Sequence, residues 1–136
     1  MTTPAPTIWP SFVYVDALEA VAWLRDTFGF VEVLVVPGED PGVVEHAQLA
    51  WPEGGGVMLG SAGRDGNVFS QRPTGTGSAY VVTDRPDELH DRAVAAGVEI
   101  LRAIQDEDYG GRGFSVRDPE GNIWSFGSYR GEPIPE

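Results

Sequence analysis

The residue of this sequence best suited to acid–base chemistry is His46, because the pKa of an imidazole lies near neutrality. It lies in an alternating apolar stretch that predicts a strand over residues 43–50. In a strand, His46 shares one face with Gln48, while Glu45 and Ala47 lie on the other. If the His46 face lines a cavity, His46 can act as a general base or bind a ligand directly. The alternative is a structural histidine whose ring bonds to a neighbouring backbone group or to Glu45.

A second set of reactive side chains lies in the acidic stretch 104–110 and just after it. Two glycines follow Asp108 and Tyr109 and would let this loop hinge over a cavity mouth. The loop is then a lid that presents Asp108 and Tyr109 to a cationic or aromatic ligand, while Arg112 pairs with a carboxylate. The alternative is an exposed connection in which Arg112 balances Asp106 or Asp108.

Composition excludes several other kinds of site. The 136 residues contain neither cysteine nor lysine, which rules out disulfides, thiolate metal sites, Schiff-base chemistry and a Walker-type phosphate lysine. The formal charge of −12 argues against a nucleic-acid or anionic-membrane partner and suits a cationic ligand, or simply keeps the protein in solution. No long apolar run or signal-peptide pattern is present, so a soluble cytoplasmic protein is expected. The remaining histidine, His90, lies among acidic residues and is expected on a solvated helix surface.

The elements that must position these side chains follow from hydrophobic periodicity and from glycine and proline punctuation. After a Pro- and Thr-rich arm, the pattern predicts a strand, a helix and three strands, and then the same series again. Asp16 and Asp84 are the predicted helix caps, and Gly29 and Gly97 end the two helices. The predicted ranges are strand 8–15, helix 17–28 and strands 30–36, 43–50 and 56–61, then strand 77–83, helix 86–96 and strands 98–103, 112–116 and 122–129.

The two series are copies of one unit. The Pro-Glu-Gly at 52–54 recurs 67 residues later at 119–121, each time followed by an apolar run and Gly-Ser. Such a unit leaves one sheet face apolar, and two copies can pair around a pseudo-twofold axis and enclose a cavity. The expected fold class is α+β, with two tandem βαβββ modules forming a curved mixed sheet around a cavity. The single domain 1–136 then comprises module one (8–61), a linker (62–76), module two (77–129) and a C-terminal tail (130–136).

The order of elements, Phe28-Gly29-Phe30 after the first helix and Asp118-Pro119-Glu120-Gly121-Asn122 before the last strand resemble the vicinal oxygen chelate superfamily. That superfamily includes glyoxalase I, the extradiol dioxygenases and the bleomycin-resistance proteins, and the resemblance covers about residues 8–129. It implies a small-molecule ligand and a homodimer. In metal-dependent members, His, Glu or Gln ligands come from the first and last strands of each module. Here the corresponding positions carry Trp9, Met58, Ser78 and Ser125.

None of these four residues is a usual ligand for a divalent metal. An indole offers only an N–H donor, a neutral serine hydroxyl is a poor ligand, and thioether sulfur is too soft. The resemblance is therefore to the metal-free members, and no cofactor is expected.

The leading hypothesis is a metal-independent small-molecule-binding protein of the glyoxalase/bleomycin-resistance type that sequesters a cationic or aromatic antibiotic. The rival is a metal-independent isomerase or lyase acting on a small carbonyl compound, with His46 as general base and Asp108 or Tyr109 assisting. A metal-dependent glyoxalase or dioxygenase is disfavoured, and a structural or regulatory binding module is the third alternative. Trp9, Tyr80 and Phe114 are predicted to stack on a flat ligand. The candidate ligand-binding residues are Trp9, His46, Gln48, Met58, Ser78, Tyr80, Arg112, Phe114 and Ser125, and the candidate catalytic residues are His46, Asp108 and Tyr109.

Overall fold

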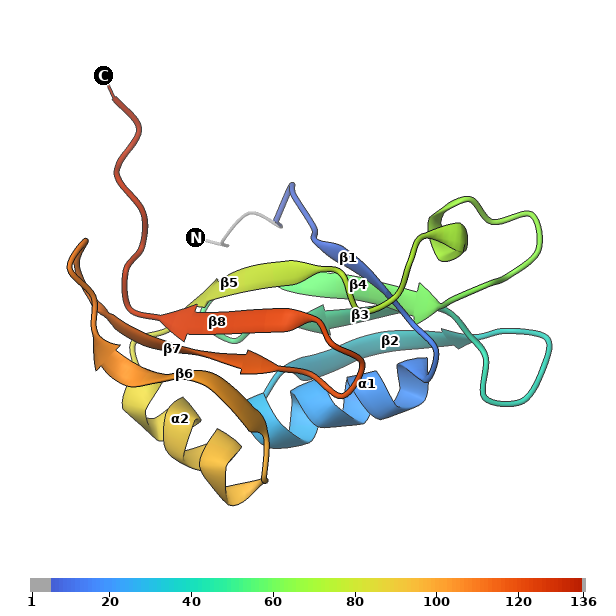
Figure 1. Ribbon diagram of the computed structural model, residues 1–136. Helices are drawn as coiled ribbons and strands as arrows, with labels where there is room; N and C mark the ends of the chain where they lie inside the picture. The colour runs from blue at the N-terminus through green and yellow to red at the C-terminus, as the bar shows by residue number, and fades with distance from the viewer. Residues whose placement is uncertain (1–5, 136) are drawn as a thin grey trace. The chain divides into compact units, whose positions relative to one another are not determined.

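The strands form two four-stranded sheets, one from each predicted module (Figure 1). The computed structural model describes residues 6–135, so most of the predicted N-terminal arm lies outside the described residues. The strand orders are β1-β4-β3-β2 and β5-β8-β7-β6. The β1–β4 and β5–β8 pairs are parallel and all other neighbours are antiparallel, so the predicted α+β class with mixed sheets is confirmed. Each predicted module supplies one of the two sheets.

The elements agree with the predicted order and differ mainly at their ends. In the described residues, no helix is both long and apolar enough to cross a membrane. The elements are β1 Ser11–Tyr14, α1 Ala17–Trp23, a π-helical turn Leu24–Phe28, β2 Val31–Pro37, β3 Val44–Ala50, β4 Gly56–Ser61, a 3-10 turn Phe69–Gln71, β5 Ser78–Val82, α2 Pro86–Ala95, β6 Glu99–Asp106, β7 Arg112–Arg117 and β8 Ile123–Gly127.

The chain divides into two compact units, each of which is described by itself below. Unit 1 comprises the described residues up to Gly77 together with Pro119–Asn122, and unit 2 comprises Ser78–Asp118 and the described residues from Ile123 onward. The predicted linker 62–76 therefore belongs to unit 1. So does the turn 119–122, although β7 and β8 on either side of it belong to unit 2.

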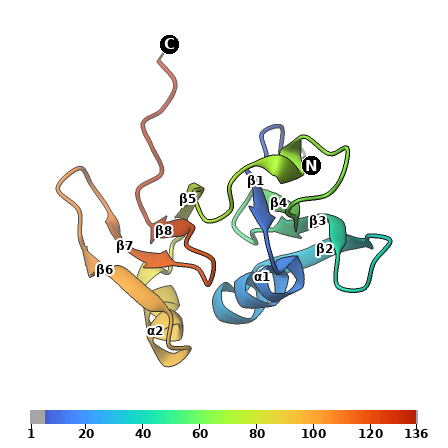
Figure 2. The ribbon, with the colours of Figure 1, turned by 45° about the vertical axis from the view of Figure 1, so that its right-hand side comes forward.

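In unit 1, α1 covers one face of the first sheet (Figure 2). The carboxylate of Asp16 accepts a hydrogen bond from the Glu19 N–H, as predicted for the cap. Gly29 ends the helical segment with φ 83°, a left-handed conformation that glycine adopts without a Cβ penalty. The prediction of one α-helix over 17–28 was wrong in its last part, because Leu24–Phe28 widens into a π-helical turn whose Leu24 and Phe28 are fully buried.

The two faces of the first sheet differ in burial. Ala47 and Leu49 of β3 are fully buried on the side that packs on α1. His46 and Gln48, on the opposite side, are only partly buried. Met58 of β4 lies directly across from Gln48 and shares that face. We call this helix-free side the open face of sheet one.

In unit 2, α2 is confirmed as a helix, but its predicted cap is wrong. The helix begins after Arg85, and no side chain caps it. The carboxylate of Asp84 instead forms an ion pair with Arg130 at 2.6 Å. The strand β6 also runs on to Asp106, where a loop was predicted, because Asp106 pairs with Arg112 across the hairpin. Only residues 107–111 remain as the connection between β6 and β7.

The polar side chains of the motif 118–122 accept hydrogen bonds from other parts of the fold. The buried carboxylate of Asp118 accepts a hydrogen bond from the Trp124 indole at 3.1 Å. In unit 1, the Glu120 carboxylate accepts hydrogen bonds from the N–H groups of Val15 (2.6 Å) and Asp16 (2.8 Å) at the start of α1. The side-chain oxygen of Asn122 accepts another from the N–H of Gly77. These polar side chains are used by the fold itself.

Candidate functional site

A pocket of about 330 Å³ lies on the open face of sheet one, within the size range of small-molecule sites. We call it the His46 pocket. Its lining residues are Ser11, Phe12, Val13, Glu45, His46, Met58, Leu59, Gly60, Arg64, Asn67 and Phe69. The pocket contains two of the predicted ligand-binding residues, His46 and Met58.

The floor of the His46 pocket is built by β1, β3 and β4. Ser11 pairs with Met58 and Val13 pairs with Gly60 across the parallel β1–β4 ladder. Paired residues point to the same side of a sheet, so these side chains share the open face with His46. Ser11 and Val13 were not predicted as site residues, although their spacing of two along β1 carries the same signal as the spacing of His46 and Gln48.

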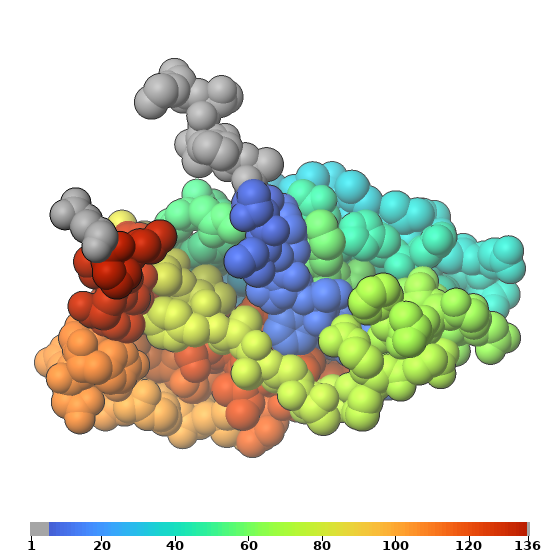
Figure 3. Space-filling model, turned by 90° about the horizontal axis from the view of Figure 1, so that it is seen from above, coloured from blue at the N-terminus to red at the C-terminus, as the bar shows by residue number. Residues whose placement is uncertain are grey.

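The wall of the pocket comes from the segment 62–72, which the sequence marked only as a linker. Figure 2 shows this segment on the side of the sheet opposite α1, and the space-filling view shows it lying beside β1 (Figure 3). Its centre is Ser70, which is 1% exposed and whose hydroxyl bonds to the backbone of Arg64 and Asn67. The Ser70 N–H in turn donates to the side-chain oxygen of Asn67. These bonds close the segment into a compact loop, which holds Arg64, Asn67 and Phe69 at the pocket.

His46 is half-buried in the pocket, and its imidazole has no hydrogen bond or ion pair with another described residue. Within residues 6–135, the alternative of a ring bonded to Glu45 or to a neighbouring backbone group is therefore wrong. Both ring nitrogens remain available to a ligand or to a proton in transfer.

A second, smaller pocket of about 70 Å³ lies in unit 2, and we call it the tyrosine pocket. It has room for one small group of a ligand and none for a whole molecule. Five of the predicted site residues border it, namely Tyr80, Tyr109, Arg112, Phe114 and Ser125. The other lining residues are Arg102, Glu107, Gly113, Ser115, Phe126, Gly127 and Tyr129.

The polar groups of the tyrosine pocket are mostly bonded to one another. The Tyr80 hydroxyl donates to the Tyr129 carbonyl at 2.7 Å, and burial raises the pKa of Tyr80. Arg102 donates two hydrogen bonds to Glu107, at 2.9 and 3.1 Å, and they hold the pKa of that carboxyl below its ordinary value. The hydroxyls of Ser115 and Ser125 lie 2.7 Å apart across the β7–β8 ladder. Little hydrogen-bonding capacity is left for a ligand.

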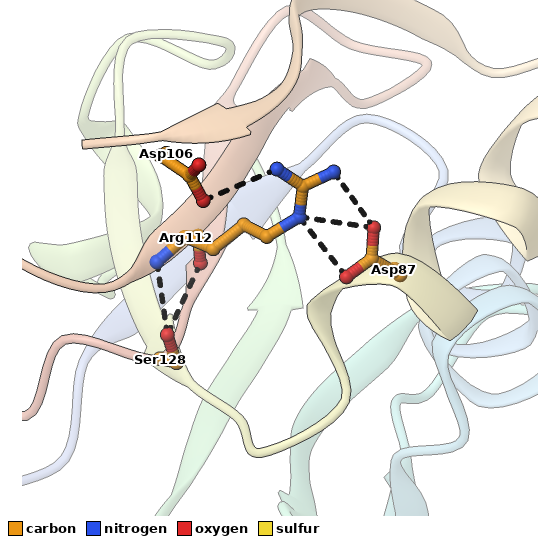
Figure 4. Close-up of polar contacts among 4 residues, drawn as sticks. All are labelled: Asp87, Asp106, Arg112 and Ser128. Carbon is orange, nitrogen blue, oxygen red and sulfur yellow. Dashed lines mark hydrogen bonds and ion pairs between the residues drawn. The ribbon is translucent and has the colours of Figure 1, made fainter.

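Arg112 forms ion pairs within unit 2, and Phe114 belongs to the core of that unit. The Arg112 guanidinium pairs with Asp87 of α2 at 3.0 Å and with Asp106 of β6 at 3.2 Å (Figure 4). The predicted alternative of a balance with Asp106 is thus observed, joined by Asp87 and not by Asp108. Phe114 is 1% exposed and stacks on Phe126 with ring centroids 5.4 Å apart.

His90 and the remaining predicted residues lie outside both pockets. His90 was predicted on a solvated surface, which is wrong, because it is half-buried and its ring meets Phe114 edge-on at 5.2 Å. Trp9 lies before β1 with its indole over Gly56, and its N–H donates to the Pro6 carbonyl. Gln48 neighbours Met58 without lining the pocket, and Ser78 and Asp108 are exposed.

The residues at the metal-ligand positions of the resemblance do not fit a metal. Trp9, Met58, Ser78 and Ser125 offer no carboxylate, imidazole or thiolate, and the Ser125 hydroxyl is bonded to Ser115. Within residues 6–135, no group of three or more His, Cys, Asp or Glu side chains is placed to hold a metal ion.

Both the sequence and the structure of this chain are similar to those of known proteins. The sequence profile of the Glyoxalase/Bleomycin resistance protein/Dioxygenase superfamily matches residues 10–126. Uncharacterized protein Mb0911c of Mycobacterium bovis is 35% identical over 137 residues, covering 96% of this chain and 86% of that protein. The crystal structure of TioX from Micromonospora sp. ML1 is similar with a TM-score of 0.76 and 32% identity, covering 90% of this chain and 98% of that one. Lactoylglutathione lyase from Agrobacterium tumefaciens shares the fold, with a TM-score of 0.67 at 22% identity over 92% and 94% of the two chains.

Proposed function

Because this chain belongs to the Glyoxalase/Bleomycin resistance protein/Dioxygenase superfamily, we propose that it binds a small organic molecule in the His46 pocket and needs no metal to do so. The observation that carries the proposal is the make-up of that pocket. Apolar side chains of the sheet form much of its floor, while His46, Arg64 and Asn67 supply a few polar groups that can orient a ligand.

The ligand class that fits this lining best is an aromatic one. Phe69 is 66% exposed at the rim of the pocket, where its ring is free to stack on a flat molecule. We therefore propose an aromatic antibiotic, and not a cationic one, as the ligand. Sequestration means that the bound molecule leaves chemically unchanged.

The second candidate function is a metal-independent isomerase or lyase acting on a small carbonyl compound. The observation in its favour is the imidazole of His46, which lines the pocket and forms no hydrogen bond with another described residue, so that its ring nitrogens can meet a substrate. Asp108 and Tyr109 belong to unit 2, whereas His46 belongs to unit 1. Of the three candidate catalytic residues, this second function therefore uses His46 alone.

A panel of aromatic antibiotics and small carbonyl metabolites, screened by thermal shift and followed by mass spectrometry, separates the two functions. We expect binders that are recovered unchanged. Phe69→Ala should weaken their binding about tenfold, in line with the loss of one aromatic contact. Val68→Ala is the matched control, because Val68 is an exposed apolar neighbour that does not line the pocket.

A hit that is converted by the wild type but not by His46→Ala would establish the enzyme instead. Equal effects of Phe69→Ala and Val68→Ala would rule out the His46 pocket as the binding site.

We further propose a cytoplasmic homodimer. The support for the homodimer is the edge strand β2, which carries the exposed apolar residues Val31, Val33, Leu34 and Val36. An apolar edge with unpaired backbone groups is a surface that proteins ordinarily cover.

A further inference from the structure

We infer that the ligand of the His46 pocket carries a carboxylate or a similar oxyanion, and that Arg64 binds it. This inference rests on the proposed function of that pocket and adds the charge of the ligand to it. It also reverses the expectation of a cationic ligand that the acidic composition suggested.

First, the fold uses only part of the hydrogen-bonding capacity of the Arg64 guanidinium. Its Nε donates to the Ser61 carbonyl at 2.9 Å, and among the described residues no carboxylate forms an ion pair with it. The chain has 21 acidic residues to nine arginines, so an arginine readily finds an acidic partner. Six others do so, namely Arg25, Arg85, Arg102, Arg112, Arg117 and Arg130. Arg64 keeps both terminal nitrogens of its guanidinium for another partner.

Second, the fold holds this guanidinium in place. The bond from Nε to the Ser61 carbonyl anchors it, and the Ser70 hydroxyl bonds to both the N–H and the carbonyl of Arg64. Gly60 leaves room beneath it, because a Cβ at that position would lie 3.1 Å from Nη2. A half-buried, positioned guanidinium binds an oxyanion with little loss of side-chain entropy.

Third, several other polar groups share the pocket with Arg64. Asn67 uses its side-chain oxygen to accept from Ser70, which leaves its amide N–H₂ as a donor. Ser11 and His46 can donate as well. Glu45 is the one acidic residue in the lining, and it is exposed. The lining thus offers mostly donors, which match an oxyanion.

The competing explanation is that Arg64 serves only to balance nearby acids. It also borders a second hollow of about 520 Å³ whose lining includes Glu39, Asp40, Glu45 and Asp65. None of these carboxylates is within ion-pair distance of the guanidinium, so any such balance acts across solvent and is weak.

The test compares 2-naphthoate with 2-naphthamide, which have the same ring and nearly the same shape but differ in charge. We expect the wild type to prefer the carboxylate about ten- to hundredfold in calorimetric titration, the range for hydrogen bonds to a charged group. Arg64→Gln should remove this preference by weakening naphthoate while leaving naphthamide nearly unchanged. Arg130→Gln is the control, since Arg130 is exposed in unit 2 and pairs with Asp84.

Equal affinity of the wild type for both compounds, or an unchanged preference in Arg64→Gln, would overturn the inference while leaving the pocket intact as a binding site. Binding of both compounds that Phe69→Ala does not alter would instead contradict the proposed function itself. High salt supplies a second readout, because it should weaken only naphthoate.

Discussion

At the scale of single residues, the polar side chains of this chain divide into those that hold the fold and those that are left for a ligand. Asp118 belongs to the first kind, since its buried carboxylate accepts a hydrogen bond from the Trp124 indole N–H. His46 and Arg64 belong to the second, because each meets the pocket with N–H groups that no described residue uses. A motif that identifies a family can therefore be structural, while the residues that we propose for binding lie elsewhere.

The role of Asp118 can be measured by its removal. Asp118→Ala leaves the indole N–H of fully buried Trp124 without this acceptor, and an unsatisfied buried donor costs about 1–3 kcal/mol. We expect a loss of that size in the free energy of unfolding, measured by denaturant titration. Asp91→Ala is the matched control, because Asp91 is exposed on α2. A loss no larger than that of the control would show that the bond contributes nothing.

At the scale of elements, one side chain links α2, β6 and β7. Arg112 of β7 pairs with Asp87 in the first turn of α2 and with Asp106 at the end of β6 (Figure 4). Hydrogen bonds from Arg112, followed by its charge, lower the pKa of Asp87 in the folded state. The hairpin and the helix are thus joined by a contact that depends on pH.

The sign of this dependence follows from the lowered pKa of Asp87. The contact stabilises the folded state fully above the ordinary pKa of 3.8, and the contribution is lost as pH falls through the lower folded-state pKa. We expect Asp87→Asn to be less stable than the wild type at pH 6, with a difference that shrinks toward zero below about pH 4. Urea titrations across this range measure it, with Asp91→Asn as the control. A difference that grows as pH falls would contradict the assignment.

At the scale of the whole molecule, the edge of sheet one at β2 carries exposed apolar side chains. β2 is one of the two outer strands of this sheet, and Val31 and Val33 are 52% and 50% exposed on it. The strand carries one charged residue, Glu32, and no lysine, although charged residues commonly prevent strands from pairing between molecules. A second copy of the chain is the partner that we propose for it.

A charge on the edge strand tests this. We expect the wild type to elute as a dimer in size-exclusion chromatography with light scattering, and Val33→Lys to weaken the dimer at least about tenfold by burying a charge at the interface. Val94→Lys is the control, because Val94 is equally exposed on α2 and the substitution changes the net charge by the same amount. A monomeric wild type, or a dimer that Val33→Lys leaves unchanged, would refute the edge as the interface.

The sequence alone determined the features that depend on neighbours along the chain. Alternation identified β4 with its observed bounds and placed His46 and Gln48 together on the partly buried face of β3. The repeat of turns and helix stops predicted two copies of one unit, and the family followed from their order. Such signals are local, because strand period and glycine conformations are set by a few adjacent residues.

Only the tertiary structure decided which residues surround His46 and which partners the charges take. The segment 62–72 has no period, so nothing in its sequence shows that the buried hydroxyl of Ser70 folds it over the sheet and brings Arg64 and Phe69 to the pocket. The pairing of Arg112 with Asp87 likewise joins residues 25 positions apart. These contacts depend on which elements pack together, and the sequence pattern of one element does not contain that information.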